Sequence, residues 1–92
     1  MSASELEELL KGCRKVLRVL RVFMEHEGEP LTRYRIEKEA AIYYSPSVLE
    51  RLLKLGIIRI VGEEPTLYEL NSEHRLVKAL RKLFEEVGYL QP

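Results

Sequence analysis

Residues 32–70 read TRYRIEKEAAIYYSPSVLERLLKLGIIRIVGEEPTLYEL, and this stretch decides the fold. Its pattern predicts two short helices followed by a two-stranded hairpin, over residues 32–41, 45–56 and 57–70. Ser45 and Pro46 are residue types that begin helices, and Gly56 is the type that ends one in a left-handed conformation. The β-branched run IIRIV follows at once and is typical of a strand.

Helical periodicity on both sides of this stretch predicts two more helices, over residues 4–27 and 72–88. Leu31 is expected to add a short strand beside the hairpin. Cys13 falls on the apolar stripe of the first helix, so we expect a small core residue there. The predicted class is α+β, mostly α, in one domain over residues 1–92: three core helices, a two-stranded hairpin and an additional C-terminal helix.

Composition limits the chain to one small globular domain. Its 92 residues are 46% hydrophobic and 33% charged, which argues against disorder, and they contain no apolar run of membrane-spanning length. The single cysteine excludes an intramolecular disulfide and fits a reducing, cytoplasmic compartment. Aspartate is absent, while glutamate, arginine and lysine are abundant, a composition that points to a thermophilic source.

The net charge of the chain is zero, but the charge is unevenly distributed. Residues 30–60 contain six basic and three acidic side chains, a balance of +3, whereas residues 61–72 contain three glutamates and no basic residue. Local potential, more than total charge, steers a charged partner. The two predicted helices therefore form a positive region, and the hairpin tip is negative.

The predicted helix over residues 45–56 has one polar and one apolar side. The polar side carries Ser47, Glu50, Arg51 and Lys54 at spacings of three and four. Val48, Leu52 and Leu55 lie opposite and would fix the helix to its scaffold. A helix that reads DNA bases needs this division, although an ordinary amphipathic helix with a solvated face shows it too. Its place between a turn and a hairpin favours the DNA-reading interpretation.

The stretch resembles the winged helix-turn-helix domains of small archaeal DNA-binding proteins and of MarR-type and ArsR-type regulators. The residues that carry the resemblance are Thr32-Arg33, Ile36, Ala40, Val48, Leu52, Leu55-Gly56-Ile57-Ile58-Arg59, Tyr68 and Leu70. The resemblance implies that the helix over residues 45–56 enters the major groove, while the hairpin, or wing, lies along the backbone or minor groove. The candidate DNA-binding residues are Thr32, Arg33, Arg35, Tyr43, Tyr44, Ser45, Ser47, Arg51 and Lys54. Wings of this family usually carry basic residues at the tip, so the acidic tip Glu63-Glu64-Pro65 is left out of the site.

Two further surfaces are open to more than one interpretation. The basic face of the first helix comprises Arg14, Lys15, Arg18 and Arg21. It is either solvated, a partner surface, or in contact with phosphates if the helix flanks the DNA. The apolar stripe of the last helix is larger than a three-helix core requires, which predicts a homodimer, although a fourth helix covering its own core is the alternative. The candidate dimer-interface residues are Leu76, Leu80, Leu83, Phe84 and Val87.

Catalysis and cofactor binding find no support in the sequence. His26 and His74 lack a second ligand at metal spacing, and no nucleophile motif or phosphate loop is present. We therefore expect no enzyme activity and no cofactor, and no small-molecule effector is evident from the sequence. The predicted function is sequence-specific or semi-specific binding of double-stranded DNA as a transcriptional regulator associated with the nucleoid. The alternative is a winged-helix protein–protein module in a multisubunit assembly, which the zero net charge and acidic wing favour.

Overall fold

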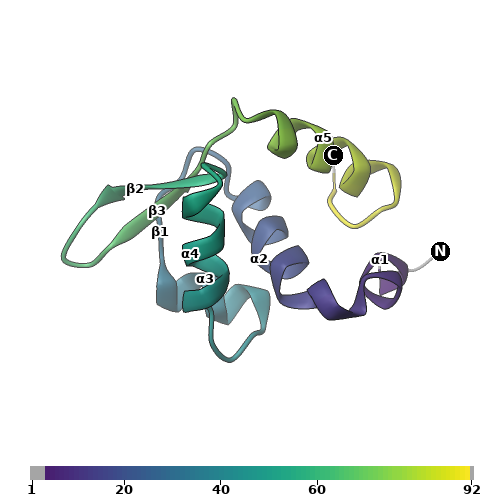
Figure 1. Ribbon diagram of the computed structural model, residues 1–92, viewed down its shortest axis with the longest axis horizontal. Helices are drawn as coiled ribbons and strands as arrows, with labels where there is room; N and C mark the ends of the chain where they lie inside the picture. Colours follow the sequence, from purple (N-terminus) through teal and green to yellow (C-terminus); the bar gives the residue numbers. More distant parts are fainter. Residues whose placement is uncertain (1–3, 92) are drawn as a thin grey trace.

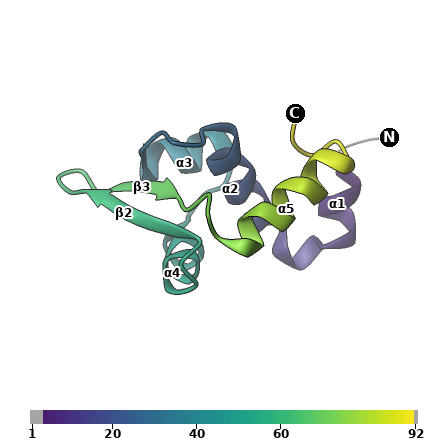
Figure 2. The same ribbon diagram turned by 90° about the horizontal axis from the view of Figure 1, so that it is seen from above.

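The computed structural model describes residues 4–91 and has an α+β fold that is mostly helical. The elements along the chain are α1 (Ser4–Leu9), η1 (Lys11–Cys13), α2 (Arg14–Glu25), β1 (Leu31–Thr32), α3 (Arg33–Ala40), α4 (Pro46–Lys54), β2 (Ile58–Gly62), β3 (Leu67–Leu70) and α5 (Arg75–Glu86). The strands form one antiparallel sheet in the order β1-β3-β2. The β2–β3 hairpin extends from one end of the molecule, and α1 and α5 lie at the other end (Figure 1 and Figure 2).

Local capping chemistry sets the ends of α3 and α4. Thr32 Oγ1 accepts a hydrogen bond from the backbone N–H of Arg35 at 3.2 Å and so caps the start of α3. α4 begins at Pro46, and the chain leaves it through Gly56, which has a left-handed φ of +75°. Both helices lie within two residues of their predicted bounds. The short strand expected at Leu31 pairs with β3.

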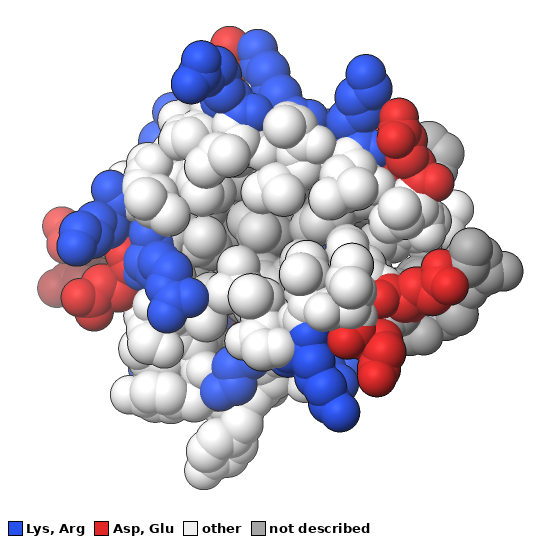
Figure 3. All heavy atoms as spheres, turned by 45° about the vertical axis from the view of Figure 1, so that its right-hand side comes forward, with Lys and Arg blue, Asp and Glu red and all other residues white. Residues whose placement is uncertain are grey.

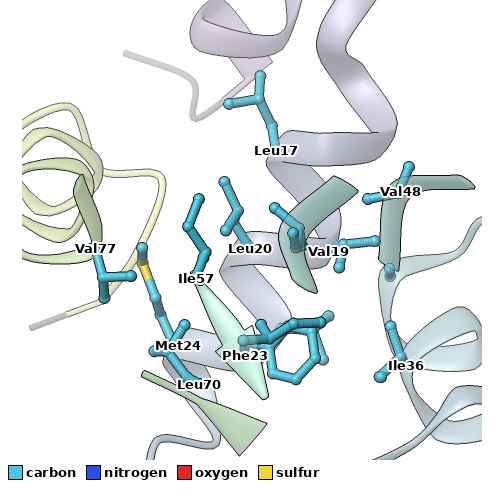
Figure 4. Packing of buried hydrophobic residues seen from close by; sticks show 14 of the residues in the cluster. Leu17, Val19, Leu20, Phe23, Met24, Ile36, Val48, Ile57, Leu70 and Val77 are labelled. Atoms are coloured by element: carbon cyan, nitrogen blue, oxygen red, sulfur yellow. The ribbon is translucent and has the colours of Figure 1, made fainter. Parts of the chain in front are cut away.

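The hydrophobic core lies where α2, α3, α4 and the sheet meet. Phe23 of α2 and Ile36 of α3 are completely buried, and Leu52 of α4 and Ile58 of β2 are nearly so. Figure 4 shows core side chains from the other elements gathered around α2. α2 is therefore the central helix of the core, and the buried apolar face of α4 packs toward it.

The first helix differs from the prediction of one continuous helix over residues 4–27. α1 ends at Leu9, a 3-10 turn follows, and α2 begins only at Arg14. The contact between Glu7 and Arg18 requires this break. In one continuous helix the two residues, eleven positions apart, would be separated by about 16 Å along the axis. In the folded chain the Arg18 guanidinium lies 3.1 Å from Glu7 Oε1, so the chain must turn between them.

The turn also changes the environment of the residues within it. Gly12 lies inside the turn, and glycine is a poor helix former. Cys13 is exposed, which contradicts the expectation that it is a core residue. Leu9 lies on the predicted apolar stripe but is 79% exposed for the same reason. The stripe of the first helix is therefore a core face only from residue 16 onward and at Leu6.

A buried polar cluster holds α1, α2 and the C-terminal segment together. The Glu7 carboxylate accepts hydrogen bonds from Arg18 Nε at 3.2 Å and from the Tyr89 hydroxyl at 2.6 Å. Burial by itself raises the pKa of Glu7, but the hydrogen bonds from Arg18 and Tyr89 outweigh it, so the pKa is lowered. Burial and the bond to Glu7 raise the pKa of Tyr89. The cluster is thus an ionised carboxylate with satisfied partners.

α5 starts three residues later than the predicted helix over residues 72–88, because His74 caps it. His74 Nδ1 accepts a hydrogen bond from the backbone N–H of Leu76 at 3.0 Å. In this tautomer the Nε2–H group of His74 donates a hydrogen bond to the backbone oxygen of Leu55, 3.0 Å away. His74 therefore joins the end of α4 to the start of α5.

Phe84 is wrongly placed in the predicted dimer interface. It is completely buried within its own chain, and its ring packs edge-on against Tyr89 with centroids 5.0 Å apart. The apolar surface of α5 has two sides: Val77 and Phe84 face the core, while Leu76, Leu83 and Val87 are between 39% and 49% exposed.

His26 joins the end of α2 to α3 through two glutamates. Its Nε2 lies 2.6 Å from Glu39 Oε1, and its Nδ1 lies 3.1 Å from Glu29 Oε1. The hydrogen bond to Glu39 is the main cause of a raised pKa for His26, burial opposes it, and Glu29 reinforces it. Arg35 pairs with both glutamates, and the pKa values of both are lowered.

The His26→Ala substitution is expected to cost more stability at acidic to neutral pH than at alkaline pH. Because folding raises the pKa of His26 above its ordinary 6.5, its contribution is fully present below that pH and is lost as the pH rises through the raised value. The difference in Tm between wild type and variant, measured by circular dichroism, should be larger at about pH 6 than at about pH 9. Equal differences at the two pH values would contradict this prediction.

Among the described residues, none of the helices combines the length and the apolar character that crossing a bilayer requires.

Candidate nucleic-acid interface

α4 presents one exposed polar face and one buried apolar face. The polar face comprises Ser47, Glu50, Arg51 and Lys54, which line a shallow hollow of about 300 Å³. The apolar face comprises Val48, Leu49 and Leu52, which pack into the core. Leu55, which is also predicted on this face, lies just after the end of the helix and is 51% exposed. Core packing therefore fixes the direction in which the polar side chains of α4 point.

A second hollow, of about 340 Å³, lies between α4 and the start of α2. Its lining residues are Lys11, Gly12, Arg14, Lys15, Val16, Ser47, Val48 and Arg51. Four of them are basic, and none of the described residues that line it is acidic. Ser47 and Arg51 line both hollows, so the two adjoin. We refer to Lys11, Arg14, Lys15, Arg51 and Lys54 together as the cationic surface.

The charges of the cationic surface are largely unneutralised. Within residues 4–91, Lys11, Arg51 and Lys54 form no ion pair with an acidic side chain. Arg14 Nε lies 3.8 Å from a Glu7 oxygen, close to the limit for an ion pair. Lys15 Nζ donates a hydrogen bond to the backbone oxygen of Tyr44 at 3.4 Å. An anion at this surface would therefore displace few existing ionic contacts.

Arg33 and Arg35, both predicted to contact DNA, are instead paired with glutamates. Arg33 Nε lies 2.9 Å from Glu37 Oε2, and Arg35 Nε lies 2.7 Å from Glu39 Oε2, each one turn along α3. Arg35 also pairs with Glu29. Neither arginine lines the two hollows, so the structure does not bring these predicted residues together with Arg51.

Ser45 is not a DNA-contacting residue, contrary to the prediction, because it is completely buried. It also does not cap α4 through its side chain. Its hydroxyl and its backbone N–H both donate to Glu37 Oε2, each at 2.8 Å. The hydrogen bond from Arg33 is the main cause of a lowered pKa for Glu37, burial opposes it, and Ser45 reinforces it. Ser45 therefore ties the start of α4 to α3.

The remaining predicted residues lie beside the cationic surface or in a cap. Tyr43 and Tyr44 occupy the turn between α3 and α4 and are 93% and 52% exposed. The guanidinium of Arg33 lies over the Tyr44 ring, 5.0 Å from its centroid. Thr32 is half-buried and its hydroxyl caps α3.

The structure divides the basic face predicted on the first helix. Arg14 and Lys15 line the hollow beside α4. Arg18 is bound to the buried carboxylate of Glu7, and Arg21 lies over the Tyr89 ring. Only the first half of the face is therefore available to an anionic partner.

Lys11 is the functional candidate that sequence reasoning missed. It reaches α4 only because the chain turns at η1, and a continuous helix would place it elsewhere. Gly12 in the middle of a predicted helix is the signal that could have located this turn.

The hairpin tip is acidic, as the sequence indicates. Glu63 and Glu64 are exposed at the turn between β2 and β3. Arg59 of β2 pairs with Glu69 of β3 at 3.3 Å, so its charge is partly neutralised. The hairpin therefore offers no cationic counterpart to the surface on α4.

No group of three or more His, Cys, Asp or Glu residues that could hold a metal ion occurs among residues 4–91. Comparisons with protein-family models, with curated proteins and with solved structures found no match.

Proposed function

We propose that this protein binds double-stranded DNA as a winged helix-turn-helix regulator, with α4 as the recognition helix in the major groove. In this proposal α2, α3 and α4 form the three-helix core and β1, β2 and β3 form the wing. α4 is an exposed α-helix, and an α-helix with its side chains is about 10–12 Å across, which suits a major groove about 12 Å wide.

The cationic surface is the observation that carries this proposal. Five basic side chains from η1, α2 and α4 adjoin two hollows, and four of the five form no ion pair within residues 4–91. A row of unneutralised cations beside an exposed helix is the electrostatic footprint expected for a nucleic-acid backbone.

The geometry supports a division of roles within this surface. Ser47 and Arg51 lie on the outward face of α4, where a hydroxyl and a guanidinium can approach base edges. Lys11, Arg14 and Lys15 stand to one side of that helix and suit phosphate groups that border the groove. The acidic hairpin tip is turned to solvent in this proposal, because phosphates repel it.

DNA binding is expected to weaken steeply as the salt concentration rises. Each phosphate neutralised by a basic side chain contributes about 0.9 to the slope of log affinity against log salt, so four to five contacts predict a slope of roughly −4 per protein chain. Fluorescence anisotropy with a labelled duplex at several salt concentrations measures this slope.

Absence of binding even at low salt would refute the proposal. The result would favour the alternative function, a protein–protein module, for which the paired arginines of α3 and the acidic hairpin tip are the supporting features.

A further inference from the structure

The exposed apolar stripe of α5 is not used by the proposed function. It consists of Leu76, Leu80, Leu83 and Val87, on one side of the helix. Leu76 is 49% exposed, Leu83 41% and Val87 39%, whereas Leu80 is partly buried against the core. Four large apolar residues in line on a surface helix mark a contact site more often than a solvated face.

Figure 3 shows the side of the molecule on which α1 and α5 lie. A broad area in its centre carries no charged side chain, and Lys, Arg and Glu residues are confined to its edges. An uncharged centre with a charged rim fits the usual anatomy of a protein–protein interface, in which charged residues are depleted at the core.

We propose that this face binds a second copy of the same chain, with the two α5 helices packed antiparallel about a two-fold axis. The spacing of the stripe is four, three and four residues, which is the same in both directions along the helix. Two antiparallel copies therefore match along their whole length: Leu76 faces the partner's Val87, and Leu80 faces the partner's Leu83. A two-fold contact requires this self-complementarity.

The charges that border the stripe are complementary in the same arrangement. Arg75 and Glu86 are exposed, stand at opposite ends of α5, and lie on the side of the stripe away from Val77 and Phe84. Antiparallel packing brings Arg75 within one helical turn of the partner's Glu86, and symmetry forms this pair twice. A parallel two-fold arrangement would instead leave Arg75 and the partner's Glu86 at opposite ends of the helix pair.

α1 extends the apolar face beyond α5. Glu5 lines a hollow together with Glu86, Val87 and Gly88, so α1 lies beside the end of α5. Leu9, one turn after Glu5, is 79% exposed. The added area matters because stable interfaces usually bury at least about 1,200 Å² in total, more than two short helices supply alone.

Sedimentation equilibrium of the full chain between about 1 and 300 µM tests the proposal. The expected result is a reversible monomer–dimer equilibrium. Leu83→Glu should raise the dissociation constant at least about 100-fold, because it places a charge in a dry contact. Val61→Glu is the matched control: Val61 is 44% exposed on β2, and its replacement should leave the constant unchanged. A monomeric wild type, or equal effects of the two variants, would overturn the proposal.

Charge reversal tests the antiparallel register separately. Arg75→Glu and Glu86→Arg should each raise the dissociation constant about 3- to 10-fold, since each creates two like-charge contacts per dimer. The variant with both substitutions restores opposite charges at each contact and should return to the wild-type constant. If the dissociation constant of the double variant were no lower than that of either single variant, this register would be overturned. Neither test depends on DNA, so the dimer and the DNA-binding proposal fail independently.

Discussion

Arg51→Glu is expected to lower DNA affinity at least about 100-fold at low salt. Arg51 lines both hollows and forms no ion pair within residues 4–91, so it is central to the cationic surface. Loss of a bidentate base contact costs about 1–3 kcal/mol, and a carboxylate at that position adds repulsion from nearby phosphates. Anisotropy titrations of a labelled duplex at one fixed salt concentration measure the effect.

Lys78→Glu is the matched control for Arg51→Glu. Its side chain is 64% exposed on α5, outside the cationic surface, and the substitution makes the same change in net charge. We expect it to change affinity less than about threefold. Equal losses for the two variants would mean that DNA responds only to total charge, and would contradict the placement of the interface on α4.

Phe84→Ala is expected to destabilise the fold by about 3–5 kcal/mol, the usual cost of removing a fully buried aromatic side chain. Phe84 is 0% exposed and supports Tyr89, whose hydroxyl binds Glu7. Its removal therefore leaves a cavity and loosens a buried polar cluster. Urea unfolding followed by circular dichroism measures the loss.

Tyr34→Ala provides the control for Phe84→Ala. Tyr34 is an aromatic residue of α3 that is 73% exposed, with Lys38 over its ring at 5.9 Å. Its replacement should change the free energy of unfolding by less than about 0.5 kcal/mol. If the two variants were equally stable, Phe84 would not be the anchor of α5 that its burial implies.

The elements that the sequence predicts well are those set by local chemistry. α3 and α4 begin and end at residues whose preferences act within one turn, such as Thr32, Pro46 and Gly56. The pairing of Arg33 with Glu37 and of Arg35 with Glu39 is local too, at a spacing of four residues. That spacing is visible in the sequence and by itself argues against both arginines as DNA contacts.

The elements that the sequence predicts poorly depend on distant contacts. The break before α2 requires Glu7 to meet Arg18 and Tyr89, and helical periodicity carries no information about such a meeting. The position of Lys11 depends on that break. Ser45 is buried because Glu37, eight residues earlier, accepts both of its donors.

Phe84 shows a different limit of sequence reasoning. The apolar residues of α5 fill two neighbouring sides of one helix, and periodicity cannot tell which side faces the core. Which side of α5 faces the core is decided only by tertiary packing, including that of Tyr89 against Phe84. Leu76 and Leu83, which look equivalent to Phe84 in the sequence, are left exposed.

The hydrogen bond between Tyr89 and Glu7 has a consequence for the order of folding. It joins residues 82 positions apart, so nearly the whole chain must be closed into a loop before it forms. Loop closure of this length carries a high entropic cost, and contacts of large sequence separation form late. We therefore expect α1 and the segment after α5 to dock late in folding, onto elements that have already formed. Because η1 connects α1 to α2 and Lys11 lines the hollow beside α4, we expect one wall of that hollow to be completed only at this late stage.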